Sequence, residues 1–304
     1  MANITASMVK ELREMTGAGM MDCKNVLVEA EGDMDKAVEF LREKGLAKAA
    51  KKAGRVAAEG LVKLAFSEDA TKAAVIEVNS ETDFVAKNEE FVDFVEKLAE
   101  MAINAEPDMD KFMELDYADE GKVKDVLNAK IAKIGENMNI RRFANFAQPG
   151  CVYIGYVHGA GKIGVIVGLE TEASAKEVET VGKDVAMQVA SMSPKFVDES
   201  EVDPAWLEEE KKIATQQLLN EGKPENMLER IIPGKIKAIL KEVCLVDQKF
   251  VKNGDLTVKQ YVDEPAKEIG KPIKIVSMAR FEVGEGIEKK EENFAEEVAK
   301  QMNA

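Results

Sequence analysis

Histidine is almost absent from this sequence. The 304 residues include a single one, His158, which excludes metal sites built on paired histidines and mechanisms that need two imidazole groups. Chemistry that uses one histidine, or none, remains open. One alternative is therefore an enzyme in which His158 acts together with a carboxylate.

Cysteine is also scarce. The three cysteines, Cys23, Cys151 and Cys244, are odd in number and far apart, without the short spacing that is typical of zinc ligands. This argues against a zinc site and against a disulfide framework, and it favours reduced thiols. Cys23 and Cys151 lie in apolar runs, which predicts buried, unreactive thiols.

Long apolar runs and an excess of positive charge are missing as well. No stretch of about 18 apolar residues occurs, and the N-terminal sequence lacks the apolar region of a secretory signal. The 42 Lys and Arg residues stand against 57 Asp and Glu, a net charge of −15, which argues against general attraction to nucleic-acid phosphates. We expect a soluble, cytoplasmic protein without a cofactor or metal ion that binds neither membranes nor nucleic acid directly.

Three short helices are predicted in residues 1–47, because apolar residues recur there at helical spacing between glycine-containing breaks. Asp33 suits the N-cap of the third helix, which we expect to stop at Gly45. Residues 48–58 are rich in lysine and alanine and have no apolar face. They are predicted to form an exposed, partly helical linker.

The next segment shows an internal repeat. Residues 59–145 and 146–203 each begin with a pattern typical of strand, strand and helix. With an offset of 90 residues and no gap, apolar positions coincide as Val62 with Val152, Leu64 with Ile154, Val75 with Val165, Phe91 with Val181, and Val95 with Val185. We interpret this as a duplication that gives two similar α+β subdomains, the second completed by residues 244–283.

Residues 204–243 interrupt the second subdomain. Two helical patterns separated by a turn at residues 221–224 predict an antiparallel helical hairpin, or coiled coil. Pro233 falls inside the second arm and should kink it. A strand is expected at residues 277–283, and a charged helix from about Ile287 to Met302 within a C-terminal module of residues 284–304.

A glycine-rich segment, GAGKIG at residues 159–164, matches the G-x-G-x-x-G pattern of dinucleotide sites. That motif requires a helix at its last glycine, but a β-branched strand pattern follows. The segment is therefore interpreted as the turn of a hairpin, and no nucleotide site is expected. His158, at the start of this turn, is interpreted as an exposed loop residue.

Residues 81–88, ETDFVAKN, allow two interpretations. Thr82 or Asp83 could cap a helix while Phe84 packs as a hydrophobic staple. Alternatively, an acid and an aromatic at a loop tip could bind a partner, with the ring filling a pocket. The repeat has Ala173 and Ser174 where this copy has Asp83 and Phe84, and a cap that the fold requires should occur in both copies. This difference is an argument for the second interpretation, but the residues alone leave both interpretations open.

Five segments together resemble the bacterial translation elongation factor Ts family. They are ITASMVKELR at residues 4–13, TGAGMMDCK at 16–24, TDFVAK at 82–87, KIGENMNIRR at 133–142 and RFEVGEGIE at 280–288. The resemblance implies an α+β fold with a ubiquitin-associated (UBA)-like three-helix domain, a core of two subdomains, a coiled-coil insertion and a C-terminal module.

The resemblance also implies a function. Members of the family are guanine-nucleotide exchange factors that bind the GTPase elongation factor Tu in its GDP form and promote GDP release, so that GTP can bind. They make no chemical bond, and they are not enzymes. Thr82, Asp83, Phe84 and Val85 match the family motif that dislodges Mg²⁺ from the GTPase.

Further positions that match the family's contacts with the GTPase are Lys10, Arg13, Met20, Met21, Ile134, Gly135 and His158. The C-terminal helix is also implied as a contact, and the helical hairpin is a candidate for homodimer formation. Besides the enzyme that uses His158, a UBA-type adaptor based on residues 1–50 is a second alternative, although it leaves most of the chain unexplained.

Overall fold

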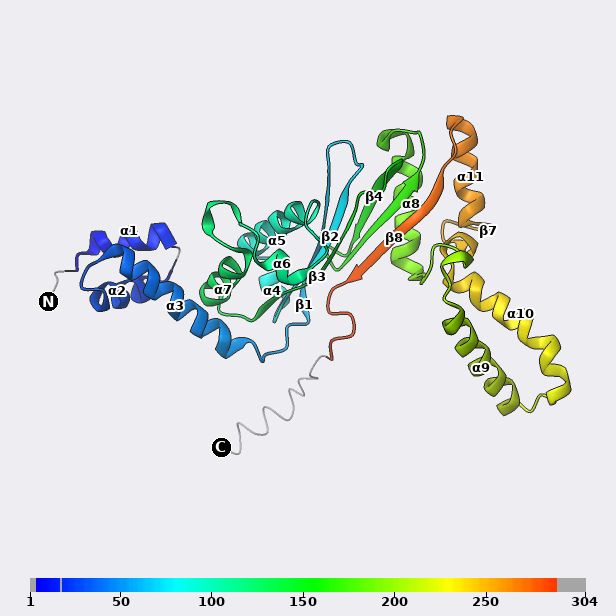
Figure 1. Ribbon diagram of the computed structural model, residues 1–304, viewed down its shortest axis with the longest axis horizontal. Coiled ribbons are helices and arrows are strands. Elements are labelled where there is room, and N and C mark those ends of the chain that lie inside the picture. Colours follow the sequence, from blue (N-terminus) through cyan, green and yellow to red (C-terminus); the bar gives the residue numbers. More distant parts are fainter. Residues whose placement is uncertain (1–3, 17, 289–304) are drawn as a thin grey trace.

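The structure, a computed structural model, describes residues 4–16 and 18–288. It has an elongated shape, with a small helical unit at one end, two three-stranded β-sheets with their helices in the middle and a helical hairpin at the other end (Figure 1). The predicted α+β class is confirmed. The predicted terminal helix lies, from residue 289 onward, outside the described residues.

The N-terminal unit consists of α1 (Ala6–Thr16), α2 (Met20–Glu29) and the first half of α3 (Met34–Lys52). Its small core includes Leu12, Cys23, Val26 and Leu27. Asp33 caps α3 as predicted, since its carboxylate accepts a hydrogen bond from the Lys36 N–H at 3.1 Å. The three predicted helices are therefore present.

The end predicted for the third helix is wrong. α3 continues through Gly45 to Lys52, and Ala49, which was expected in an exposed linker, is buried against the core. A glycine inside a helix costs about 1 kcal/mol, but Gly45 lies against α7 (Val123–Ile134), where a side chain would only just touch Ala132. Packing against α7 thus carries the helix past the residue that was expected to end it.

The first sheet has the antiparallel order β1 (Glu59–Phe66), β2 (Ala73–Ser80), β3 (Met138–Phe146). The β1–β2 hairpin was predicted, whereas β3 was not. After β2 come the one-turn helix α4 (Asp83–Ala86) and α5 (Glu89–Ala102), which packs on the sheet. α6 (Met109–Met113) and α7 then lead to β3.

The second sheet has the order β4 (Cys151–His158), β5 (Ile163–Glu170), β8 (Lys274–Glu282), again antiparallel. The helix α8 (Ala175–Met192) packs on it, as predicted. The strand expected at residues 277–283 is β8. The remaining elements are β6 (Lys249–Phe250), β7 (Asn253–Thr257), α11 (Val258–Ile269) and the 3₁₀ turns Ala118–Glu120, Glu199–Glu201 and Leu245–Asp247.

The two sheets pack face to face with their helices outside. Val62 and Val75 of the first sheet meet Tyr153 and Ile166 of the second in one buried cluster. Because α5 covers its other face, β2 is buried at every position. A strand covered on both faces reads as a continuous apolar run, which explains the pattern of residues 73–76.

The alignment of the two copies of the repeat at a constant offset of 90 residues is wrong for their first strands. The hairpin loop spans residues 67–72 in the first sheet but only 159–162 in the second. The second strands are related by 90 residues, but the first strands are related by 92. A slip of two residues leaves every side chain on the same face of a strand, so the apolar pattern could not reveal the gap.

The helical hairpin is present as predicted. It consists of α9 (Pro204–Asn220) and α10 (Glu225–Val243), which lie side by side away from the sheets (Figure 1). Pro233 lies inside α10 without interrupting it. None of the helices in the described part of the chain is long and apolar enough to cross a membrane.

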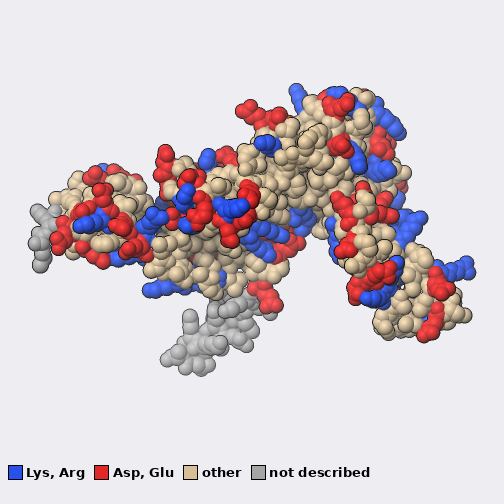
Figure 2. All heavy atoms as spheres, in the orientation of Figure 1, with Lys and Arg blue, Asp and Glu red and all other residues tan. Residues whose placement is uncertain are grey.

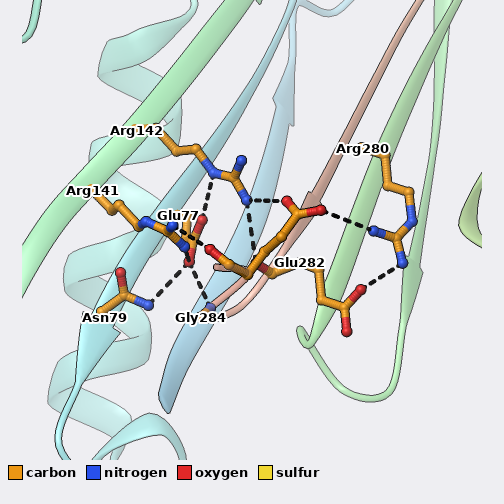
Figure 3. Close-up of polar contacts among 8 residues, drawn as sticks. Glu77, Asn79, Arg141, Arg142, Arg280, Glu282 and Gly284 are labelled. Carbon is orange, nitrogen blue, oxygen red and sulfur yellow. Dashed lines mark hydrogen bonds and ion pairs between the residues drawn. The ribbon is translucent and has the colours of Figure 1, made fainter. Parts of the chain in front are cut away.

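A buried carboxylate joins the two sheets. Glu77 of β2 is fully buried and accepts hydrogen bonds from Arg141 at 3.0 Å, Arg142 at 2.6 Å, Asn79 at 3.1 Å and the Gly284 N–H at 2.8 Å (Figure 3). Neighbouring residues of a regular strand point to opposite faces. A bulge in β3, which leaves Arg141 without a partner residue in β2, allows both arginines to reach one carboxylate.

The same cluster extends to the chain that follows β8. Arg142 also pairs with Glu285 at 2.9 Å, and Arg280 pairs with Glu282 at 2.6 Å (Figure 3). The Arg142 guanidinium stacks over the Phe281 ring. Gly284 has a φ of +73° and lies so close to the Ala58 carbonyl that a Cβ would be 2.3 Å from its oxygen. Only glycine permits this approach, which brings its N–H to Glu77.

The three cysteines are buried and free. Burial raises the pKa of Cys23 and Cys151, and it raises the pKa of Cys244 to about 11. The prediction of buried thiols is confirmed for Cys23 and Cys151.

Candidate partner-binding site

The segment expected to bind a partner forms the single helical turn α4 between β2 and α5. Thr82 is its N-cap, because the Thr82 hydroxyl accepts a hydrogen bond from the Val85 N–H at 3.4 Å. Lys87 is the C-cap of the turn, and Asn88 caps the next helix by accepting a hydrogen bond from the Phe91 N–H. The capping role in the first interpretation of this segment is thus correct for Thr82.

Phe84 does not pack as a hydrophobic staple. Its side chain is 81% exposed, whereas Val85 and Ala86 of the same turn are buried. A staple requires a residue just before the N-cap to pack against the fourth helical residue, and Phe84 occupies neither position. The turn therefore buries its aliphatic residues in the core and directs its one aromatic ring into solvent.

Comparison of the two sheets indicates that α4 is an addition. Residues 81–87 separate β2 from the cap of α5, but only residues 171–173 separate β5 from Ser174, which caps α8. A cap thus occurs in both copies, at Asn88 and Ser174, so the expectation that it was missing from the second copy was wrong. What the second copy lacks is the turn that carries Phe84.

Asp83 lies beside Phe84 as a half-exposed, charged group. Its carboxylate pairs with Lys87 one turn later, at 2.6 Å. This hydrogen bond lowers the pKa of Asp83 below its usual value, and the charge of Lys162 adds to the effect although Glu59 opposes it. The turn therefore presents an ionised acid next to an aromatic ring at neutral pH.

The structure brings Ile134 and Gly135 next to this turn. Gly135 ends α7 in the left-handed conformation with a φ of +91°, and the residue after it is Glu136. The Glu136 carboxylate accepts hydrogen bonds from the Thr82 N–H at 3.0 Å and from the Thr82 hydroxyl at 2.7 Å. Two segments predicted to contact the same partner are thus joined directly. Glu136 itself was not singled out from the sequence.

His158 is the exposed last residue of β4, as expected for a hairpin end. Its Nδ1 is 2.9 Å from the Tyr156 hydroxyl. The glycine-rich turn that follows connects β4 to β5, which confirms the hairpin interpretation. No group of three or more His, Cys, Asp or Glu side chains within the described residues is arranged to hold a metal ion.

The four N-terminal candidates lie in the three-helix unit, away from α4 (Figure 1). Lys10 and Arg13 are exposed on α1, and Met20 and Met21 are 59% and 65% exposed at the start of α2. Met15, near the end of α1, is also exposed, at 63%, which sequence reasoning missed. Exposed large apolar side chains are typical of interaction surfaces when they form one patch.

Charged side chains do not form one large patch of a single sign on the visible face of the molecule. Figure 2 shows acidic and basic side chains interspersed over the helical unit, the core and the hairpin. The exposed apolar groups of α2 and α4, rather than a charged field, therefore distinguish the candidate contact regions.

Comparison with known proteins agrees with these features. The sequence model of one protein family, described as Elongation factor TS, matches residues 81–285, from the Thr82 segment to the end of the Glu77 cluster. The chain belongs to the elongation factor Ts family. It is therefore a translation elongation factor.

Relatives within this family are similar along their whole length. The chain is 58% identical to elongation factor Ts of Clostridioides difficile (strain 630) over 303 residues, which are 99% of this chain and 100% of that protein. It is 56% identical to that of Clostridium novyi (strain NT) over 99% of both chains, and 55% identical to that of Clostridium perfringens (strain SM101 / Type A) over 98% of both.

Proposed function

We propose that this protein is a guanine-nucleotide exchange factor for the GTPase elongation factor Tu. It binds the GDP form and promotes GDP release, partly by displacing Mg²⁺, so that GTP can bind. The observation that carries the proposal is Phe84, an 81% exposed aromatic ring on a helical turn that the equivalent part of the second sheet lacks.

The chemistry of the turn supports a wedge mechanism. Phe84 inserts between side chains of the GTPase near its nucleotide site, and burial of the ring provides the driving force. Asp83, already ionised, disturbs the region that orders Mg²⁺. Its ion pair with Lys87 is between exposed groups, and such pairs are weak enough to be exchanged for a new partner. Loss of Mg²⁺ removes positive charge beside the phosphates and so weakens the binding of GDP to the GTPase.

The other candidates hold the GTPase while the turn acts. Lys10, Arg13, Met20 and Met21 bind its nucleotide domain from the three-helix unit, Ile134 and Gly135 contact it beside the turn, and His158 contacts a more distant domain. By thermodynamic linkage, a factor that weakens GDP binding is itself weakened by GDP to the same extent. GTP then dissociates the nucleotide-free complex.

The direct test is nucleotide release. The GTPase is loaded with fluorescent GDP, and the full chain is added in catalytic amounts with excess unlabelled GTP. We expect release to accelerate in proportion to the added chain. Release at the intrinsic rate at every concentration would overturn the proposed function.

His158→Ala separates this function from the enzyme alternative. His158 is exposed, and a contact at the rim of an interface contributes less than about 1.4 kcal/mol, which corresponds to less than tenfold in affinity. We expect exchange to require more factor for half-maximal rate but to reach nearly the same maximum. If His158 acted in bond chemistry instead, its replacement by alanine would abolish turnover.

A further inference from the structure

The turn that carries Phe84 is too short to be rigid by itself. α4 has four residues, and an isolated helical turn is unstable because its nucleation is unfavourable. A ring that must enter a protein surface loses less entropy if it is held in one orientation beforehand. Contacts from outside α4 therefore have to fix the orientation of the turn and of the Phe84 ring.

Glu136 provides that support from the other side of the segment. Its two carboxylate oxygens accept from the Thr82 N–H and the Thr82 hydroxyl at 3.0 and 2.7 Å. The same hydroxyl accepts from the Val85 N–H at 3.4 Å. A continuous chain of hydrogen bonds therefore runs from the carboxylate through Thr82 to the residue after Phe84. Hydrogen bonds to an ionised acceptor are stronger than neutral ones.

Neighbouring residues reinforce the same junction. The Asn137 N–H donates to the Glu81 carboxylate, and the Asn137 side chain donates to the Arg55 carbonyl at 2.7 Å. Arg55 in turn pairs with Glu81 at 3.5 Å. Glu136 thus belongs to a junction that ties the start of α4 to the end of α7.

We propose that Glu136 is a positioning residue for nucleotide exchange. It fixes the start of α4 so that Phe84 is presented in one orientation, and it makes the Thr82–Val85 turn and Ile134–Gly135 a single rigid contact surface. This inference rests on the proposed exchange function. Glu136 acts through Thr82 and Phe84 and needs no contact of its own with the GTPase.

If Glu136 only stabilised the fold, Glu136→Ala would lower the stability of the whole protein. Val85 and Ala86 keep the second half of the turn attached to the core in this variant, and the hydrogen bonds of Thr82 at its start are only partly buried, so water can replace the carboxylate there. Glu136→Ala should therefore leave the unfolding transition nearly unchanged. Its effect should appear in the order of the turn and in the exchange rate.

The first measurement is amide hydrogen exchange of the free protein. In Glu136→Ala, we expect the Thr82 and Val85 amides to exchange about tenfold faster than in the wild type, as follows from the loss of one charge-assisted hydrogen bond. Glu136→Gln keeps one acceptor oxygen and should restore part of the protection. Unchanged protection in Glu136→Ala would overturn the proposal, whatever the chain does to a GTPase.

The second measurement is GDP release from the GTPase at saturating factor. Glu136→Ala should lower the maximal rate about tenfold, with a smaller change in the concentration needed for half-maximal rate. The matched control is Glu106→Ala, which removes an exposed carboxylate beyond the far end of α5. With this control variant, the GTPase should release GDP at the same rate as with the wild-type factor.

The double variant Glu136→Ala/Phe84→Ala shows whether Glu136 acts through the ring. If it does, the double variant is no slower than Phe84→Ala alone. If Glu136→Ala slows both backgrounds by the same factor, the two residues act independently and the positioning role is refuted. Should Phe84→Ala alone leave release unchanged, the wedge mechanism fails, while amide protection still reports on Glu136 separately.

Discussion

Replacing Phe84 with alanine will slow catalysed GDP release about 30-fold. An aromatic side chain that fills a pocket at the centre of an interface contributes about 2 kcal/mol or more when it is truncated, and 2 kcal/mol corresponds to about 30-fold in rate. Because the ring is 81% exposed in the free protein, the fold loses almost nothing. The measurement is the rate of fluorescent GDP release at saturating factor, with circular dichroism to monitor folding.

The matched control is Val251→Ala, which truncates an exposed apolar side chain between β6 and β7. This variant should exchange nucleotide at the wild-type rate, since exposed apolar area alone has no role in the mechanism. Equal rates for Phe84→Ala and the wild type would refute the wedge, even if the chain as a whole accelerates release.

Glu77→Gln will destabilise the fold by about 3 kcal/mol. The carboxylate is fully buried, and the substitution leaves the charge of Arg141 without this counterion and that of Arg142 with only its exposed partner Glu285. Breaking a buried ion pair on one side costs about 3–5 kcal/mol, and we expect the lower end because both arginines keep some contact with water. Urea denaturation at neutral pH measures the change.

The effect of Glu77→Gln will also depend on pH. Burial by itself would raise the pKa of Glu77, but hydrogen bonds from Gly284, Asn79 and the two arginines outweigh it and lower the pKa below 4.5, its usual value. A carboxyl whose pKa is lower in the folded state stabilises the fold above its unfolded pKa, and this contribution disappears as the pH falls through the folded pKa.

The difference in stability between the wild type and Glu77→Gln should therefore be constant above about pH 5 and shrink below about pH 4.5. Glu282→Gln serves as the control, because this carboxylate belongs to the same cluster but is half exposed and should cost less than about 1 kcal/mol. A difference for Glu77→Gln that stays the same down to acidic pH would show that the carboxylate is not charged in the folded protein.

The Glu77 cluster also explains why β3 escaped prediction. Residues 138–146 carry Arg141 and Arg142 in the middle of the strand, which interrupts the alternation expected of a half-buried strand. Their charges are accommodated because a bulge directs both toward one buried acid on β2. Nothing near residue 141 in the sequence indicates that partner, since Glu77 is 64 residues away.

The predicted end of α3 and the ungapped alignment of the repeat were wrong for related reasons. Gly45 did not end α3 because α7, far along the chain, packs against it. The repeat was aligned without a gap because side-chain alternation cannot detect a shift of two residues. Local patterns predict which elements form, but contacts between distant segments decide where they end and how they pair.

By itself the sequence determined the local elements and the excluded chemistry. The periodicity of apolar residues predicted the three N-terminal helices, the β1–β2 and β4–β5 hairpins and the α9–α10 pair, because this periodicity is set within a few residues. The single histidine ruled out paired-histidine sites, and the three distant cysteines argued against a disulfide framework. Only the tertiary structure decided that Phe84 is exposed rather than packed as a staple, and that Glu136 holds its turn. That contact joins residues 54 positions apart, and no local pattern encodes a meeting of chain segments that only folding brings together.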